Sequence, residues 1–378
     1  MEIPVKLESH NESNLFLRST WAEFRKEFGR FGWQYMPYKE GKNNRIFFGM
    51  MGIGDESALE VSVSYKQKGI VSKIHFDSNS ISDEFKKRLT NIVKQAHLSI
   101  NNIQTFTGRY YFTSPQGAIA NYSGSNFSIY PVQKAINAIE LEVKAFDKVD
   151  AQTEAKKLLF KILDFLSVCT NSSFSFSESP RAIKTISNVK QVYFENDDWI
   201  DDYPIVKDSL GLTKLQCAFL ERIISGDIEI NHPVLLACSH FHAAQKQWSF
   251  DVPVENNNTE LASVLYVSAL EVAATMDVQD NAICEKCKQP IYKIRQRVLD
   301  LTKTYANGLE SFIDDYYKMR SKYLHAGILF SDLSYAGVSI PLLDETEKGF
   351  RQQSAIAPIN LREYVGYILR KIFVVKLQ

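Results

Sequence analysis

The pattern of apolar and polar positions divides the chain into a mixed first part and a helical second part. Before residue 203, short runs of alternating or clustered apolar residues predict strands. Two longer stretches, 82–99 and 151–168, carry apolar residues at helical spacing, with Phe85, Leu89 and Ile92 on the inner face of the first. The strands are expected at 44–51, 59–65, 70–76, 103–112, 127–131 and 138–146, with a short helix at 21–29.

After residue 203 the apolar positions recur every three or four residues, which predicts an almost wholly helical part. Polar residues near Asn231 and Asn257, and Pro290 in a first turn, indicate helix starts. Short connections favour antiparallel neighbours and therefore an up-and-down bundle. The helices are expected at 213–225, 232–247, 260–275, 289–305, 309–327 and 360–376.

The predicted fold class is therefore α+β, with an N-terminal mixed domain at 1–200 and a C-terminal helical bundle at 203–378. Each part is long enough to have its own core. The acidic run 195–202 precedes the second part. Such a run is typical of a solvated loop, and the alternative is a phosphate mimic that blocks a basic groove.

Composition narrows the classes of function. The 378 residues carry a net charge of zero, so any contact with nucleic acid must come from a local basic patch. No apolar run approaches the ~20 residues that span a bilayer. The first residues are too charged for a signal peptide, so we expect a cytoplasmic protein without a membrane partner. An odd count of five cysteines argues against a disulfide framework.

One pair of residues suggests chemistry. Arg320 and His325 lie in the predicted helix 309–327, and Arg320 falls inside its apolar stripe, where a charge is costly unless it is paired or used. An arginine can hold a phosphate with two hydrogen bonds, and a histidine can move a proton near neutral pH. The alternative is an arginine paired with Asp314 or Asp315 in a core, with a surface histidine near the helix end.

Helix geometry places a condition on this pair. At roughly 100° per residue, His325 lies about 140° around the helix from Arg320. An ideal helix therefore does not aim both side chains at one point. Either the last turn departs from ideal geometry or a second chain completes the site.

The segment 312–327 resembles the signature helix of the HEPN superfamily. Its motif is an arginine, a usually polar residue, three further residues and a histidine, which Arg320, Ser321 and His325 match. Ser321 stands where the motif usually has Asn, His or Asp. In layout, residues 203–378 look most like the ApeA-like HEPN proteins of bacterial phage defence.

This resemblance implies a metal-independent endoribonuclease that needs no cofactor. The ribose 2′-OH would attack its own 3′-phosphate and leave a 2′,3′-cyclic phosphate and a 5′-hydroxyl. His325 would act as general base or acid, Arg320 would bind the phosphate, and Ser321 would hold water or a ribose hydroxyl. The resemblance also implies a homodimer that cuts tRNA or other RNA in antiviral defence or as a growth-arresting toxin. A phage-derived trigger or an antitoxin would then be a partner, and the N-terminal domain a sensor or substrate guide.

Other residues are candidates for supporting roles. Lys322 and Tyr323 flank the pair, and Glu271, a carboxylate amid apolar residues, is expected to pair with or orient Arg320. A basic stretch predicts contacts with the RNA backbone, and its alternative is a solvated helix face. Its members, with one lysine beside the pair, are Lys286, Lys288, Lys293, Arg295, Arg297 and Lys318. Tyrosines in the predicted strands suit either base stacking or the core: Tyr110, Tyr111, Tyr122 and Tyr130.

Cys284 and Cys287 have the spacing of half a structural zinc site. The other half would be Cys238 with His240 or His242, or the same pair from a second protomer. The alternative is a pair of free, reduced cysteines. A competing function for the whole chain is a non-catalytic dimerisation scaffold, in which Arg320 forms a core ion pair and the N-terminal domain binds a protein or nucleic acid.

Overall fold

The computed structural model describes residues 1–29, 31–39, 44–53, 58–66, 69–78, 81–178, 191–196, 198–248, 258–276, 293–328 and 358–376. The fold class is α+β with a helical C-terminal region, as predicted. The chain divides into two compact units. The first consists of Met1–Thr107 with Glu142–Ala155, and the second of Gly108–Leu141 with Lys156–Gln378.

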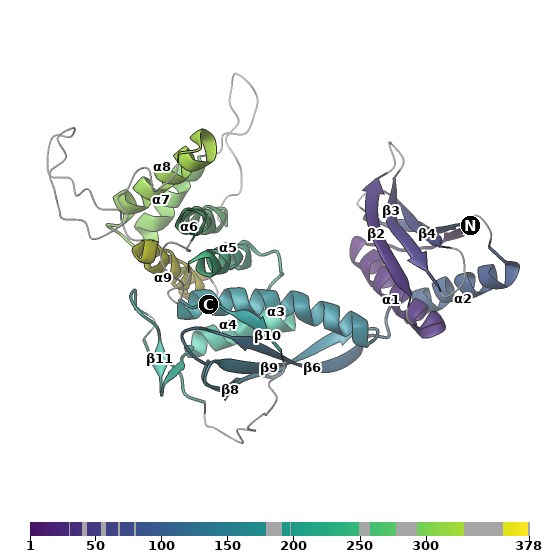
Figure 1. Ribbon diagram of the computed structural model, residues 1–378, viewed down its shortest axis with the longest axis horizontal. Helices are drawn as coiled ribbons and strands as arrows, with labels where there is room; N and C mark the ends of the chain where they lie inside the picture. Colours follow the sequence, from purple (N-terminus) through teal and green to yellow (C-terminus); the bar gives the residue numbers. More distant parts are fainter. Residues whose placement is uncertain are drawn as a thin grey trace. The chain divides into compact units, whose positions relative to one another are not determined.

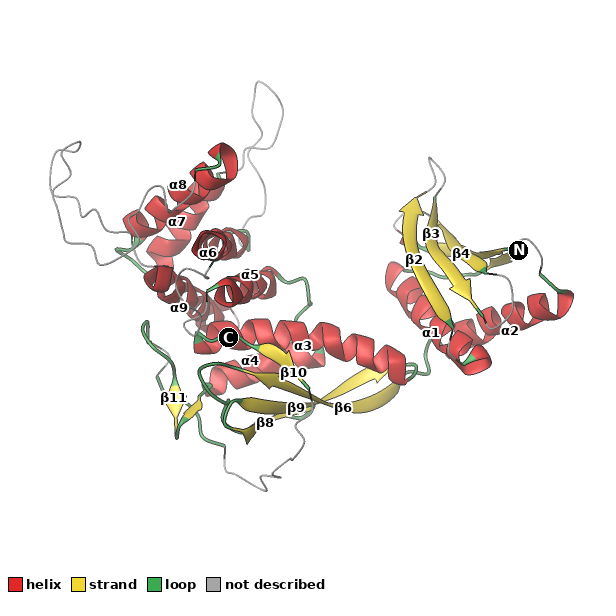
Figure 2. Ribbon diagram, in the orientation of Figure 1, coloured by secondary structure: helices red, strands yellow, loops and turns green. Residues whose placement is uncertain are grey.

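The first unit is an antiparallel sheet with two helices against it (Figure 2). Its strand order is β1-β5-β4-β3-β2. The helices are α1 (His10–Phe28) and α2 (Asp83–Ser99), and their apolar faces share one core with β3, β4 and β5. The strands are β1 (Glu2–Pro4), β2 (Gly32–Lys39), β3 (Arg45–Gly52), β4 (Leu59–Tyr65) and β5 (Val71–Asp77).

Sequence patterns identify α2 better than α1. Ser82 caps α2 by accepting a hydrogen bond from the Phe85 amide, and the predicted inner face is buried. In contrast, α1 begins eleven residues before the predicted start, at His10. This helix buries hydroxyl groups that bond to its own backbone, among them Ser13 to Ser9 O and Thr20 to Phe16 O, both at 2.8 Å. Because these buried residues are polar, the inner face of α1 does not show as a regular pattern of apolar positions.

A second antiparallel sheet, in the order β10-β6-β9-β8-β7, lies mostly in the second unit, while residues 104–107 and 142–155 of this region belong to the first. Its strands are β6 (Gln104–Thr113), β7 (Tyr122–Ser123), β8 (Phe127–Gln133), β9 (Ile136–Ala145) and β10 (Ser175–Ser177). The long helix α3 (Lys148–Thr170) packs on it, with Leu159, Ile162 and Leu166 buried and Leu158 half-buried. A small hairpin, β11 (Ile205–Val206) and β12 (Ser209–Leu210), follows.

Six further helices complete the described part of this unit (Figure 1). Side chains cap the first three of these helices, at Thr213, His232 and Asn258, whereas Lys293 and Leu309, before the next two, make no side-chain cap hydrogen bond. The predicted start at 289–290, including Pro290, lies outside the described residues, and α7 begins at Ile294. The helices are α4 (Lys214–Ser225), α5 (Pro233–Gln247), α6 (Thr259–Ala273), α7 (Ile294–Tyr305), α8 (Glu310–Ala326) and α9 (Pro358–Lys376).

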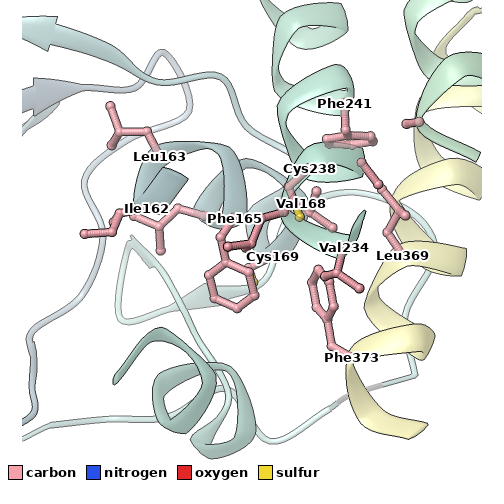
Figure 3. Packing of buried hydrophobic residues seen from close by; sticks show 14 of the residues in the cluster. Ile162, Leu163, Phe165, Val168, Cys169, Val234, Cys238, Phe241, Leu369 and Phe373 are labelled. Atoms are coloured by element: carbon pink, nitrogen blue, oxygen red, sulfur yellow. The ribbon is translucent and has the colours of Figure 1, made fainter. Parts of the chain in front are cut away.

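The sheet, α3 and the later helices share one hydrophobic core. Figure 3 shows Phe165 of α3 and Phe373 of α9 among these residues, with Cys238 and Phe241 of α5. The ring of Phe373 lies 5.1 Å from that of Phe165 and stacks on Phe219 at 5.6 Å. The predicted domain boundary at 200–203 therefore falls inside a continuous core, because α3 buries its apolar face against helices that follow that boundary.

The acidic run is anchored to α9 rather than being wholly solvated. Asp198 accepts hydrogen bonds from Tyr367 Oη and forms an ion pair with Lys371 Nζ, each at 2.8 Å. Trp199 is buried, and the Arg370 guanidinium lies 3.6 Å from the centre of its ring. Asp201 and Asp202 remain exposed, as expected of a loop. None of the described helices is long and apolar enough to cross a membrane.

Candidate functional site

The predicted motif helix is α8, which packs against α6 and α7. Ile313 and Tyr316 are buried, so the predicted apolar stripe faces the bundle. The helix is continuous to Ala326 and ends at Gly327, whose φ of 66° is favourable for glycine. Regular geometry thus persists past His325, and the angular separation of about 140° between the two motif residues remains.

Arg320 forms a two-pronged ion pair with Glu271 of α6. Its NH1 donates to Glu271 Oε1 at 2.9 Å, and its NH2 lies 2.7 Å from Oε2. The Ser268 hydroxyl is 3.5 Å from NH2. Both side chains are mostly buried, at 18% and 15% exposed. The expected pairing with Glu271 is confirmed, and the alternative partners Asp314 and Asp315 are wrong.

Two more polar side chains surround this ion pair. The ring of Tyr317 lies 6.0 Å from the Arg320 guanidinium, and burial raises its pKa, helped by the Glu271 carboxylate. His240 of α5 is half-buried, and burial lowers its pKa. The negative charge of Glu271 raises the pKa of His240, and the positive charge of Arg320 lowers it. The sequence suggested His240 only as a zinc ligand, because nothing in its spacing shows that α5 and α8 flank α6.

The rest of the motif is partly or fully exposed. His325 and Lys322 are exposed, and Ser321 and Tyr323 are half-buried. His325 lies about one and a half turns beyond Arg320 along α8. Within one chain, the structure therefore brings Glu271 to Arg320 but not His325.

The basic candidates lie in different environments. Arg295 and Lys318 share the Asp314 carboxylate, with Arg295 Nε at 2.6 Å and Lys318 Nζ at 2.8 Å. The hydrogen bond from Arg295 holds the pKa of Asp314 down at about 2, so the carboxylate is charged at neutral pH. Lys293 is exposed at the start of α7, and Arg297 is half-buried. Lys286 and Lys288 lie outside the described residues.

The four candidate tyrosines also have different environments. Tyr122 is 2% exposed and holds the backbone of Leu212 and Val192 through its hydroxyl, so it belongs to the core. Tyr130 donates to Glu140 at 3.1 Å. Tyr110 and Tyr111 are half-buried and line a pocket.

A second histidine, His242, belongs to a buried network that links α3, α5 and residue 174. Its Nδ1 lies 2.7 Å from Asp164 Oδ1, and the same carboxylate accepts from the Ser239 hydroxyl at 2.5 Å. With its proton on Nδ1, His242 accepts a hydrogen bond at Nε2 from the backbone amide of Phe174, with 3.0 Å between the two nitrogens. Because the serine bonds to the aspartate rather than to the histidine, this is a structural cross-link and not a nucleophile with its base.

This network predicts a pH dependence of stability. Burial lowers the pKa of His242, so the folded chain holds it neutral where the unfolded chain already takes up a proton. We expect the free energy of unfolding to fall as the pH drops below about 6.5 towards the folded pKa. His242→Gln should make this decline shallower and cost about 1–3 kcal/mol at pH 7, since the Asp164 carboxylate and the Phe174 amide lose a partner. Urea unfolding at a series of pH values measures both, and an unchanged pH slope would contradict the prediction.

The predicted zinc site lies largely outside the described residues, which include neither Cys284 nor Cys287. Of the expected remaining ligands, Cys238 is fully buried, and burial raises its pKa. His242 uses both ring nitrogens within the protein. The described part of the chain has no group of three or more His, Cys, Asp or Glu side chains arranged to hold a metal.

The central feature is therefore an arginine held by a carboxylate between α6 and α8, with tyrosine and histidine neighbours and an exposed histidine further along the same helix. No family model, curated protein or solved structure matches the chain.

Proposed function

We propose that the chain is a metal-independent endoribonuclease in which Arg320 and His325 act on the RNA phosphate. His325 removes the proton from the ribose 2′-OH or returns a proton to the leaving 5′-oxygen. Arg320 stabilises the negative charge that builds on the phosphate oxygens. The products are a 2′,3′-cyclic phosphate and a 5′-hydroxyl, and the need for a 2′-OH selects RNA over DNA.

The observation that supports this proposal is the two-pronged ion pair of Arg320 with Glu271. Glu271 fixes the plane of the Arg320 guanidinium and occupies only some of the five N–H donors of this arginine. An arginine held in this way is ready to bind a phosphate, because little side-chain entropy remains to be lost. Lys322 is exposed one turn before the end of α8, where it can add a second positive charge for the RNA backbone. Ser321 would hold a water molecule or a ribose hydroxyl.

The geometry of α8 supports a homodimer as the active form. Arg320 and His325 leave a regular helix in different directions, so one chain does not aim both at the same phosphate. A two-fold axis beside α8 would place the partner subunit's His325 opposite Arg320. Two-fold dimers are the commonest oligomers. In this arrangement each of two sites combines an arginine from one chain with a histidine from the other.

We further propose a cytoplasmic role in antiviral defence or growth arrest, with tRNA as the first RNA to test. A phage-derived trigger or an antitoxin would control such an activity. The first unit of the chain would then be the sensor or substrate guide.

Purified wild-type protein and His325→Ala should be compared on total tRNA in EDTA. We expect the wild type to leave cyclic phosphate ends and the variant to cut about 10²–10⁴ times more slowly, the range that general acid–base catalysis contributes. Lys134→Ala, which removes an exposed charge after β8, is the matched control and should cut normally. Cleavage that His325→Ala retains in full would rule out this assignment.

One observation favours a second candidate, the dimerisation scaffold. Arg320 already has a carboxylate partner, as a structural ion pair requires. In a scaffold, Arg320→Ala would destabilise the fold, since it leaves Glu271 without its partner, and His325→Ala would have almost no effect. Toxicity in cells separates the two candidates if purified protein is inactive, because only the enzyme loses toxicity with His325→Ala.

A further inference from the structure

A pocket of about 530 Å³ opens in the second unit, where α3 passes β6 and β10. In Figure 1, β10 lies beside α3 at this edge of the sheet. The volume is within the range of small-molecule sites. Its walls include two phenylalanines, two tyrosines and two cations: Phe160, Phe176, Tyr110, Tyr111, Arg109 and Lys156.

The aromatic side chains of this pocket are unusually open to solvent. Phe160 is 51% exposed and Phe176 is 44% exposed. Their rings lie 5.0 Å apart at an angle of 87°, an edge-to-face pair. This geometry presents the edge of one ring to the face of the other and leaves further ring faces free. Such faces stack well on a flat aromatic ligand, and every nucleobase offers one.

The charges of the pocket favour a singly charged anion. Arg109 is held by Glu140, with NH2 at 2.6 Å from Oε1, so its charge is largely balanced. Lys156 is exposed one helical turn before Phe160 on α3, and among the described residues it has no bonded partner. The lining therefore offers one unbalanced ammonium group beside the aromatic rings. A phosphodiester carries one negative charge, which matches it.

We propose that this pocket binds a nucleotide, with its base on Phe160 and Phe176 and its phosphate at Lys156. The hydroxyl of Tyr110 is the available group for the polar edge of the base, since the Tyr111 side chain is bonded to Arg109. A free mononucleotide and one nucleotide of a single-stranded RNA share a base and a phosphate, although the phosphomonoester of the free nucleotide carries about −1.5 to −2 charges near pH 7. Occupation of the pocket does not depend on the proposed cleavage, because every lining residue lies outside α6 and α8.

Binding should be measured on the full chain carrying His325→Ala, so that RNA is not cut during titration. The probes are AMP and UMP, and fluorescein-labelled hexamers of uridylate and adenylate. We expect Phe176→Leu to weaken binding between about five- and one-hundred-fold, the usual loss when a base loses its stacking partner. Lys156→Ala should lower the slope of log Kd against log salt by about 0.7, the value for one contact to a single strand. Lys134→Ala removes an equal charge outside the pocket and should change neither quantity.

The two kinds of probe identify the source of the nucleotide. Tighter binding of the hexamers assigns the pocket to an RNA chain, whereas equal binding assigns it to a free nucleotide. Failure of all probes to bind overturns the proposal, and so does binding that Phe176→Leu and Lys156→Ala leave unchanged. Equal affinity for an acidic aromatic dipeptide also overturns it. Cleavage of RNA without binding at this pocket would overturn the pocket proposal and leave the ribonuclease proposal intact. Binding at the pocket without cleavage would leave the pocket proposal intact and count against the ribonuclease proposal.

Discussion

A one-to-one mixture of Arg320→Ala and His325→Ala chains is expected to cut RNA although neither chain does so alone. In a mixed dimer, one site combines the intact arginine of one chain with the intact histidine of the other. The second site lacks both. Random pairing makes half of the dimers mixed, and each has one intact site of two, so the mixture should recover about a quarter of the wild-type rate. Co-expression with two different tags, followed by tRNA cleavage in EDTA, measures this recovery.

Glu271 provides the matched control for this experiment. Glu271 and Arg320 belong to the same half of the site, since they form an ion pair within one chain. A mixture of Arg320→Ala with Glu271→Ala chains therefore contains no intact site in any dimer and should remain inactive. Two outcomes would contradict the composite site. One is recovery in this control, and the other is no recovery in the first mixture when both tags are present in one dimer.

The local part of the site can be predicted from the sequence. Apolar residues at helical spacing predict α8 and place Arg320 on its buried face. Glu271 is the single charged side chain of the apolar stretch 265–273, where a carboxylate needs a partner. The choice between Glu271, Asp314 and Asp315 could not be made in this way, because it depends on which helix packs on α8. The sequence also gives no sign that His240 of α5 lies near this ion pair.

The division of the chain into units was harder to predict than its elements. The six predicted strands and most of the predicted helices begin and end within a few residues of the expected positions, since their apolar periodicity is local, whereas the strands β1, β2, β7, β10, β11 and β12 were not predicted. The shared core of α3 with α5 and α9 depends on contacts between residues far apart in sequence, such as Phe165 and Phe373. The acidic run 195–202 was predicted incompletely for the same reason. Its composition indicates a loop, yet Trp199 is buried against Arg370 of α9.

Replacing Gly366 by alanine is expected to destabilise the second unit strongly, although glycine to alanine within a helix normally stabilises by up to about 1 kcal/mol. An added Cβ would lie 2.5 Å from Asn171 Oδ1 and 3.0 Å from Arg370 NH1. These two atoms bond to each other at 3.0 Å, and the Cβ would separate them. The neighbouring ring of Phe241, 3.2 Å away, blocks relief on the other side.

The size of this effect follows from the burial of Arg370. Its guanidinium is buried, and in the described part of the chain it donates only to uncharged oxygens: NH1 to Val168 O and Asn171 Oδ1, and NH2 to Trp199 O. Burial lowers the pKa of Arg370 to about 9, so the group is still charged at pH 7 and relies on these acceptors. Losing one of them, together with the overpacking, should cost about 2–4 kcal/mol in free energy of unfolding.

Urea unfolding of Gly366→Ala beside Val375→Ala tests this expectation. Val375 is 62% exposed on the same helix, so its replacement should change stability by less than about 0.5 kcal/mol. Adding Arg370→Ala removes the group that the new methyl displaces, and in that background Gly366→Ala should cost at least about 1 kcal/mol less. A stabilised Gly366→Ala variant would mean that Asn171 and Arg370 can move apart freely, and equal costs in both backgrounds would mean that displacement of Arg370 does not cause the loss of stability. The coupling between the two substitutions therefore measures how firmly α9 is fixed to the end of α3.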